Sequence, residues 1–182
     1  NYRKDLKEAA YIFGEIHQQP IDETAEKVFV NEKETILSAR INECHYLLES
    51  VFTSEFVPLQ AQKLFAEALN RCEKNVGQQR YFIDLDHWCI NNTEVNSHNF
   101  IIGEKGYLID WEKPVISHPV QDISQFLAST TTLWRSNLVL TPMEKDLFLS
   151  SYLEVTGVDP VSFMEALKIY HPYLMLRALA WS

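Results

Sequence analysis

The sequence has few cysteines, few glycines and no cluster of basic residues. Its three cysteines, Cys44, Cys72 and Cys89, are far apart and odd in number, which argues against a disulfide framework and against a zinc site. The five glycines do not form the G-x-G-x-x-G pattern of a phosphate-binding loop. Sixteen Lys and Arg residues stand against 25 Asp and Glu, for a formal charge of −9, and no basic block would neutralise a run of phosphates. We therefore do not expect the chain to bind nucleic acid.

Long hydrophobic runs are also absent. No apolar stretch reaches the roughly 18 residues that a membrane helix needs, so no membrane contact is expected. The 182 residues are 46% hydrophobic and 23% charged, which is ordinary for one globular domain. We expect residues 1–182 to form a single reduced, cytoplasmic domain. The chain opens with Asn1 directly in a helical pattern and shows no signal-peptide pattern, so we expect it to be a fragment of a longer protein.

Helical periodicity dominates both ends of the chain, where apolar side chains recur at steps of three and four residues. The runs are residues 6–16, 37–51, 64–76, 123–127, 147–152 and 163–169. Pro58, a residue type favoured in the first turn of a helix, precedes the third run, and the period returns after Pro119. The tail, Tyr173–Trp181, is apolar nearly all round, which predicts that it is buried or covered by chain outside this sequence.

The middle of the chain has a different pattern. Tyr81–Ile90 is short and rich in aromatic and branched residues, and we expect Cys89 to be a buried thiol in a strand. Phe100–Ile102 and Tyr107–Ile109 are apolar runs separated by Gly103–Gly106, which is typical of a β-hairpin. The predicted fold class is therefore α+β and predominantly helical, with a small β-hairpin near the middle that carries the polar residues of interest.

Three polar residues converge at the end of this predicted hairpin. Asn99 starts its first strand, Asp110 ends its second strand, and Glu94 lies five residues before Asn99 on the loop that leads in. Because a hairpin brings its strand ends together, Asn99 and Asp110 are expected to lie close in space. Amide and carboxylate oxygens suit Mg²⁺, which keeps waters and phosphates as its other ligands. A carboxylate such as Glu94 can accept the proton of an attacking hydroxyl.

This order resembles the phosphoryl-transfer layout of kinases, in which a carboxylate is followed by an Asn, a hairpin and an Asp. Its form here, with Ile109-Asp110-Trp111-Glu112 and then Pro119-Val120-Gln121-Asp122-Ile123, resembles the aminoglycoside phosphotransferase / choline kinase family. Members of that family usually show His-Gly-Asp-x-x-x-x-Asn, then Ile-Asp-Trp/Phe-Glu, then Asp-Pro-x-x-Asp-Leu. Phe13-Gly14-Glu15-Ile16-His17 is a looser match, to a family helix that ends in Leu or Ile and His.

The resemblance implies a protein-kinase-like C-terminal (large) lobe and an ATP- and Mg²⁺-dependent phosphotransferase. The γ-phosphate of ATP would pass to a hydroxyl of a small-molecule acceptor. Glu94 would be the catalytic carboxylate, Asn99 and Asp110 would hold the Mg²⁺ that bridges the ATP phosphates, and Glu112 would assist the metal. Asp122 would brace the catalytic loop. The small N-terminal lobe of the family is missing from this chain, so we expect the chain alone to bind ATP weakly or not at all.

The sequence departs from the family pattern in the loop, where Asn92, Thr93 and Glu94 stand for His, Gly and Asp. Glutamate keeps the acid chemistry but adds a methylene, and positioning is most of the catalysis in phosphoryl transfer. The alternative function is therefore a catalytically degenerate pseudokinase or binding module that keeps the fold. A third interpretation is a helical scaffold in which the motif is accidental.

Each candidate residue also has a structural interpretation. Asp110 can cap the loop after a strand, and Glu94 can be a solvated loop acid. His98 is expected to point to the opposite side of the strand from Asn99, because successive residues alternate. Trp134 and Arg135 follow an unusual run of three threonines and are candidate contacts for the acceptor, although a helix end packed on the core explains them equally well.

Overall fold

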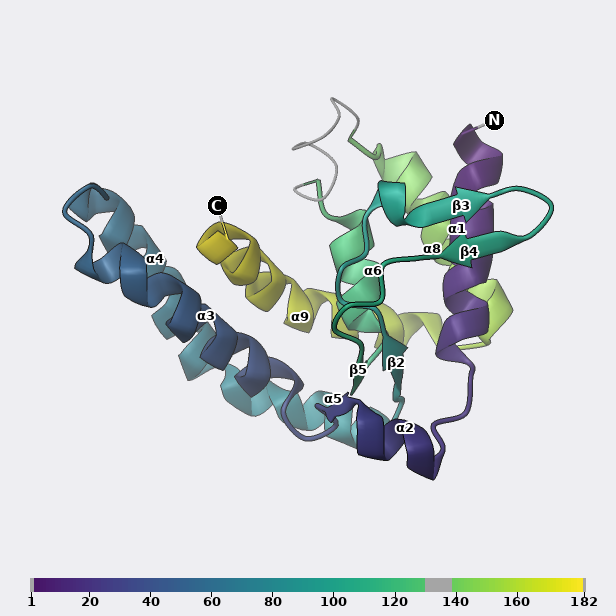
Figure 1. The fold of residues 1–182 in the computed structure, drawn as a ribbon, viewed down its shortest axis with the longest axis horizontal. Coiled ribbons are helices and arrows are strands. Elements are labelled where there is room, and N and C mark those ends of the chain that lie inside the picture. Colours follow the sequence, from purple (N-terminus) through teal and green to yellow (C-terminus); the bar gives the residue numbers. More distant parts are fainter. Residues whose placement is uncertain (1, 130–138, 182) are drawn as a thin grey trace.

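The computed structural model describes residues 2–129 and 139–181 (Figure 1), and the chain is α+β and predominantly helical, as predicted. The helices are α1 (Tyr2–His17), α2 (Glu23–Val28), α3 (Ile36–Thr53), α4 (Leu59–Lys74), α5 (Gln79–Leu85), α6 (Val120–Leu127), α8 (Pro142–Thr156) and α9 (Pro160–Trp181), with 3₁₀ turns at Val76–Gln78 (η1) and Ser97–Asn99 (η2). The strands are β1 (Val30–Asn31), β2 (Cys89–Asn91), β3 (Phe100–Ile102), β4 (Gly106–Leu108) and β5 (Val115–Ser117).

The six runs with helical periodicity correspond to α1, α3, α4, α6, α8 and α9, which confirms those predictions, although the third run ends at Val76 in η1, beyond the end of α4. Pro58 is the N-cap residue of α4. The segment Tyr81–Ile90 differs in part from the expectation, because α5 extends helical structure to Leu85. Asp86 ends that helix in the left-handed conformation, with a φ of 48°. Cys89 is a fully buried thiol at the start of β2, as predicted.

The β structure is larger than the predicted hairpin. β3 and β4 form that hairpin, with Phe100 opposite Leu108 and Ile102 opposite Gly106. A second sheet has the strand order β1-β5-β2, in which β5 pairs parallel with β1 and antiparallel with β2. Each of its strands has only two or three residues. Alternation over so few residues gives no recognisable strand pattern, so the sequence did not predict this sheet.

We call α1, α6, α8, the two sheets and the loops between strands β2 and β5 the body. α1 packs against α8 and against the β3–β4 hairpin. Two glycines permit these approaches: a methyl group at Gly14 would lie 2.6 Å from Val155 Cγ1 of α8, and one at Gly106 would overlap Ile12 of α1. A continuous core of aliphatic and aromatic side chains, among them Phe13, Ile123 and Phe148, fills the space between these elements.

We call α3, α4 and the part of α9 from Tyr170 onward the arm. α3 and α4 pack together and project from the body (Figure 1), and α9 packs against both of them. The arm has its own core, which includes Leu37, Leu48 and Tyr173, and the Tyr173 hydroxyl donates a hydrogen bond to the Cys72 carbonyl at 3.0 Å. α9 links the two regions, because Phe163 belongs to the core of the body and Tyr170 to that of the arm.

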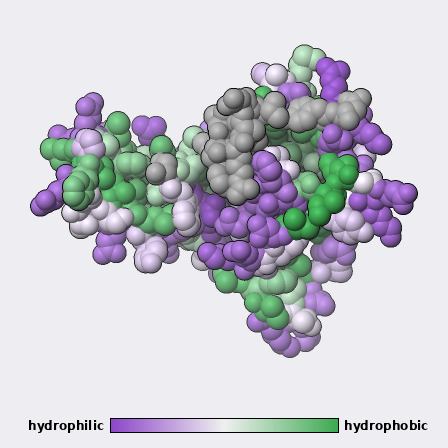
Figure 2. All heavy atoms as spheres, turned by 45° about the horizontal axis from the view of Figure 1, so that its top comes forward, coloured by the Kyte–Doolittle hydropathy of each residue, from purple (hydrophilic) through white to green (hydrophobic). Residues whose placement is uncertain are grey.

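The surface is mixed in character. Figure 2 shows hydrophobic side chains over the outer part of α3–α4 and over the β3–β4 hairpin, with hydrophilic ones between them. Phe56, at the turn between α3 and α4, is 97% exposed. The predicted burial of the tail holds for Tyr173 and Leu174 but not for Trp181, which is exposed. None of the described helices is both long enough and apolar enough to cross a bilayer.

Candidate active site

The loop that carries Glu94 is anchored to a buried carboxylate. Asp122 lies in the first turn of α6 and is fully buried. Its Oδ2 accepts a hydrogen bond from the Asn92 N–H at 2.7 Å, and its Oδ1 accepts one from the Thr93 N–H at 2.9 Å. Hydrogen bonds to an ionised acceptor are roughly twice as strong as neutral ones. The two residues before Glu94 are thereby fixed to α6.

A histidine of α1 completes the surroundings of Asp122. His17 Nε2 lies 3.5 Å from Asp122 Oδ2, and its Nδ1 lies 2.9 Å from the Tyr152 hydroxyl of α8. Burial raises the pKa of Tyr152 well above its usual value, and so do the nearby Cys89 and Asp122. Tyr152 is therefore a neutral hydroxyl, and the His17 ring lies between it and the carboxylate. Helices α1, α6 and α8 thus meet at the base of the loop.

Side chains of the loop bind the segment that follows the hairpin. Asn92 donates from Nδ2 to the Asp110 carbonyl at 2.9 Å, and its Oδ1 accepts from the Glu94 N–H at 3.0 Å. Thr93 Oγ1 donates to the Lys113 carbonyl at 2.9 Å. Thr93 and Asp110 both have a left-handed backbone, with φ values of 68° and 67°. Such conformations cost energy for residues other than glycine and persist where the surroundings enforce them.

Asn99 connects the loop to the hairpin. It lies in η2 directly before β3, rather than within the strand as predicted, and is only 7% exposed. Its side-chain Nδ2 donates to the Glu94 carbonyl at 2.8 Å, and its own carbonyl accepts from the Ile109 N–H at 2.9 Å. The amide oxygen of Asn99, Oδ1, has no hydrogen-bond donor among the described residues.

Two exposed carboxylates, Asp110 and Glu112, follow β4, and Asp110 lies two residues beyond the end of that strand. Among residues 2–129 and 139–181, no group of three or more His, Cys, Asp or Glu side chains is arranged to hold a metal ion. The donor set here consists instead of one amide oxygen and one or two carboxylates. Such a set fits Mg²⁺, which is commonly bound through one or two carboxylates with waters and substrate phosphates as further ligands.

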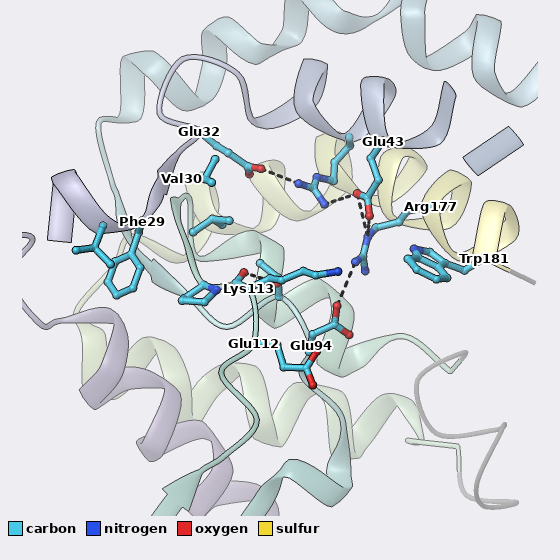
Figure 3. A pocket seen from close by; sticks show the side chains of 14 residues that line it. Phe29, Val30, Glu32, Glu43, Glu94, Glu112, Lys113, Arg177 and Trp181 are labelled. Atoms are coloured by element: carbon cyan, nitrogen blue, oxygen red, sulfur yellow. Dashed lines mark hydrogen bonds and ion pairs between the residues drawn. The ribbon is translucent and has the colours of Figure 1, made fainter. Parts of the chain in front are cut away.

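A cavity of about 540 Å³ opens beside Glu94 (Figure 3). The body contributes Thr93, Glu94 and Glu112 to its wall, and the arm contributes Glu43, Arg177 and Trp181. Arg177 Nη2 lies 3.7 Å from Glu94 Oε1, so the candidate catalytic carboxylate faces a cation from the last helix. The sequence analysis did not identify Arg177. The one feature that could have indicated it is that it is a single cation within an otherwise apolar tail.

Other predicted residues lie elsewhere. His98 is an exposed residue of the η2 turn rather than of a strand, so strand alternation does not decide its direction; its N–H donates to Asn96 Oδ1 at 2.9 Å. Trp134 and Arg135, the candidate contacts for the acceptor, lie outside the described residues. The structure thus brings together Glu94, Asn99, Asp110 and, through the loop backbone, Asp122.

No model of a known protein family matches the sequence, and no curated protein is significantly similar to it.

Proposed function

We propose that this chain is the large lobe of an ATP- and Mg²⁺-dependent small-molecule phosphotransferase with a protein-kinase-like fold. The observation that carries the proposal is the position of Asn99. Its side chain holds the Glu94 carbonyl, and its backbone holds the end of β4 directly before Asp110. Asn99, itself a candidate metal ligand, therefore links the backbone of the candidate base to the residue before the other candidate ligand, Asp110. Phosphoryl transfer depends mainly on such positioning and on charge stabilisation.

The residues divide the chemistry between them. Asn99 and Asp110 would hold Mg²⁺, which neutralises charge on the ATP phosphates when it is bound. Glu94 would accept the proton of the acceptor hydroxyl as its oxygen attacks the γ-phosphorus and the bond to ADP breaks. The cavity beside Glu94 is large enough for a small molecule. The rest of the ATP site would come from an N-terminal lobe outside these 182 residues.

A second candidate function is a degenerate pseudokinase or binding module. The loop sequence Asn92-Thr93-Glu94 favours it, because it departs from the His-Gly-Asp of the family that the chain resembles. The replacement of Gly by Thr at position 93, where the backbone is left-handed, points the same way.

The test uses the full-length gene product with Mg²⁺ and ³²P-labelled ATP, offered to a panel of amino alcohols, polyols and aminoglycosides. Asp110→Asn should lower phosphate transfer at least about 100-fold, because it removes a charge from the metal site. Its circular dichroism spectrum and unfolding midpoint should stay close to those of the wild type, since Asp110 is exposed. Asp84→Asn, at another exposed aspartate, is the matched control. If the Asp110→Asn variant retains turnover, Asp110 does not bind the metal ion.

Glu94→Asp separates the two candidate functions in the same assay. A marked gain in transfer would show that Glu94 is a degenerate replacement. A loss would show a loop adapted to the longer side chain. Absence of transfer to every acceptor, with ATP binding retained, would favour the binding module.

A further inference from the structure

Five charged side chains of alternating sign cross the wall of the cavity and end at Glu94 (Figure 3). In order, they are Glu32, Arg40, Glu43, Arg177 and Glu94. Successive ion pairs are 2.6 Å, 2.5 Å, 3.0 Å and 3.7 Å long. The chain of charges starts next to β1, passes through α3 and α9, and reaches the loop of the body. It therefore connects the arm to the candidate base.

The inner end of this chain of charges is fixed. The Glu32 and Arg40 side chains are only 5% and 10% exposed, whereas that of Glu94 is 40% exposed. The Glu32 N–H donates to the Ile116 carbonyl of β5 at 2.8 Å, which ties this end to the three-stranded sheet. Glu94 is thus the most exposed member of the chain of charges, and it is the group proposed to do chemistry.

Arg177 is itself held before it reaches Glu94. Its Nε lies 3.0 Å and 3.1 Å from the two carboxylate oxygens of Glu43. The guanidinium is planar and presents its donors in a rigid fork, so fixing Nε also directs the Nη groups. Nη2 is the group directed at Glu94. A lysine at this position would supply the charge without this geometry.

The length of the side chain at position 94 matches this arrangement. An aspartate would be shorter by one carbon–carbon bond, about 1.5 Å. Since Glu94 Oε1 is already 3.7 Å from Arg177 Nη2, an aspartate on the same backbone would fall outside ion-pair distance. The longer carboxylate and the cation that faces it are therefore complementary.

We infer that Arg177 is a positioning residue, which fixes the Glu94 carboxylate over the cavity and compensates for the glutamate at this position. The inference rests on the proposed function, in which Glu94 is the proton acceptor. In this role Arg177 acts through Glu94, whatever contact it makes with the acceptor as part of the cavity wall. The catalytic effect of one residue should consequently depend on the presence of the other.

The first test observes the ion pair and requires no catalysis. NMR of the ¹⁵N-labelled full-length gene product would follow the Arg177 side-chain N–H signals. Glu94→Gln should change the shifts and hydrogen exchange of the Arg177 Nη groups. Glu112→Gln is the control, because Glu112 lies on the same cavity wall but forms no ion pair with a described residue. This variant should leave the Arg177 signals unchanged. Unchanged Arg177 signals in Glu94→Gln would overturn the inference.

The second test is a double-mutant cycle with hydrolysis of Mg·ATP, in which water replaces the acceptor. Water attacks the γ-phosphorus, its proton goes to Glu94, and ADP and phosphate leave. Glu94→Asp and Arg177→Met should each lower kcat about tenfold, with the KM for ATP changed less than about twofold. The double variant should lose about tenfold in kcat, not the 100-fold product. Arg177→Lys should recover only part of the loss, and its folding can be checked separately.

The outcomes of these tests distinguish failure of the positioning role of Arg177 from failure of the proposed function. Additive losses in the cycle would overturn the positioning role even if Mg·ATP is hydrolysed. If the full-length protein hydrolyses no ATP and phosphorylates no acceptor, the proposed function fails and the positioning role fails with it. In that case the NMR experiment still shows whether the ion pair exists.

Discussion

The body and the arm hold the candidate site by different means. In the body, the loop backbone at Asn92 and Thr93 is fixed by short hydrogen bonds to the fully buried Asp122. From the arm, Arg177 approaches the Glu94 side chain at 3.7 Å in a partly exposed pair. Buried charge-assisted hydrogen bonds are strong, whereas exposed ion pairs contribute little to stability. The body therefore sets where the loop lies, and the arm sets where its side chain lies at little cost to folding.

The largest expected effect comes from the inner end of the arm's chain of charges. Arg40→Met leaves the buried Glu32 without its cation, and we expect a loss of about 4 kcal/mol in the free energy of unfolding. Burial raises the pKa of Glu32 even against the opposing effect of Arg40. The folded variant therefore takes up a proton more readily than the unfolded chain, and the loss should be larger at pH 8 than at pH 5.

Urea unfolding at both pH values measures this difference. Arg80→Met is the control, because its partner Asp84 lies 2.7 Å away on an exposed helix surface. The free energy of unfolding of that variant should stay within about 0.5 kcal/mol of the wild-type value. Similar losses in Arg40→Met and Arg80→Met would show that the arm has no buried ionic anchor.

Asp122→Asn is the corresponding change in the body, and we expect it to lower the free energy of unfolding by about 3 kcal/mol. The Asn92 and Thr93 N–H groups each bond a different oxygen of Asp122, and the amide replaces one of these oxygens with an NH2 donor, so one buried N–H is left unpaired. Amide hydrogen exchange at positions 92 and 93 should rise together with the loss of stability. Protection at both positions in a variant of wild-type stability would contradict the anchoring role of Asp122.

The sequence predicted the helices of both regions well, because each carries an apolar stripe over several turns. The hairpin was predicted from two apolar runs around Gly103 and Gly106, with its second strand displaced by one residue. The three-stranded sheet was missed, since strands as short as Val30–Asn31 show no alternation. Helix α5 was missed because its aromatic residues are as typical of strands as of helices.

The candidate site was predicted unevenly for a related reason. Glu94, Asn99 and Asp110 lie within 17 residues of one another, so a local hairpin argument was enough to group them. Arg177 and Glu43 come from helices distant in sequence, and only the packing of α3 against α9 brings them together. No spacing rule along the chain reports such a contact.

A titration in the body gives a smaller, pH-dependent effect. Burial, together with the neighbouring His87 and His17, lowers the pKa of His118 to about 3. Between this value and the ordinary histidine pKa of about 6.5, the unfolded chain binds the extra proton. Stability should therefore fall as the pH falls through this range, by about 1.4 kcal/mol per pH unit, or about 2 kcal/mol at pH 5.

His118→Asn should flatten this acid slope, because asparagine keeps an acceptor for the Val120 N–H and does not titrate there. The exposed His98→Asn is the control and should retain the slope. Chemical unfolding at pH 7, 6 and 5 provides the measurement. If His118→Asn keeps the full slope, the acid sensitivity comes from other groups.

The smallest effect concerns Thr93, where strain in the loop and its attachment oppose one another. Its φ of 68° costs about 1 kcal/mol for a residue with a Cβ, and its hydroxyl bond to the Lys113 carbonyl recovers about as much. Thr93→Gly removes both contributions, so its free energy of unfolding should stay within about 0.5 kcal/mol of that of the wild type. Thr93→Val keeps the strain but loses the hydrogen bond, so it should be about 1 kcal/mol less stable. Urea midpoints that rank glycine below valine would show that the hydroxyl contributes little and that rigidity at position 93 stabilises the loop.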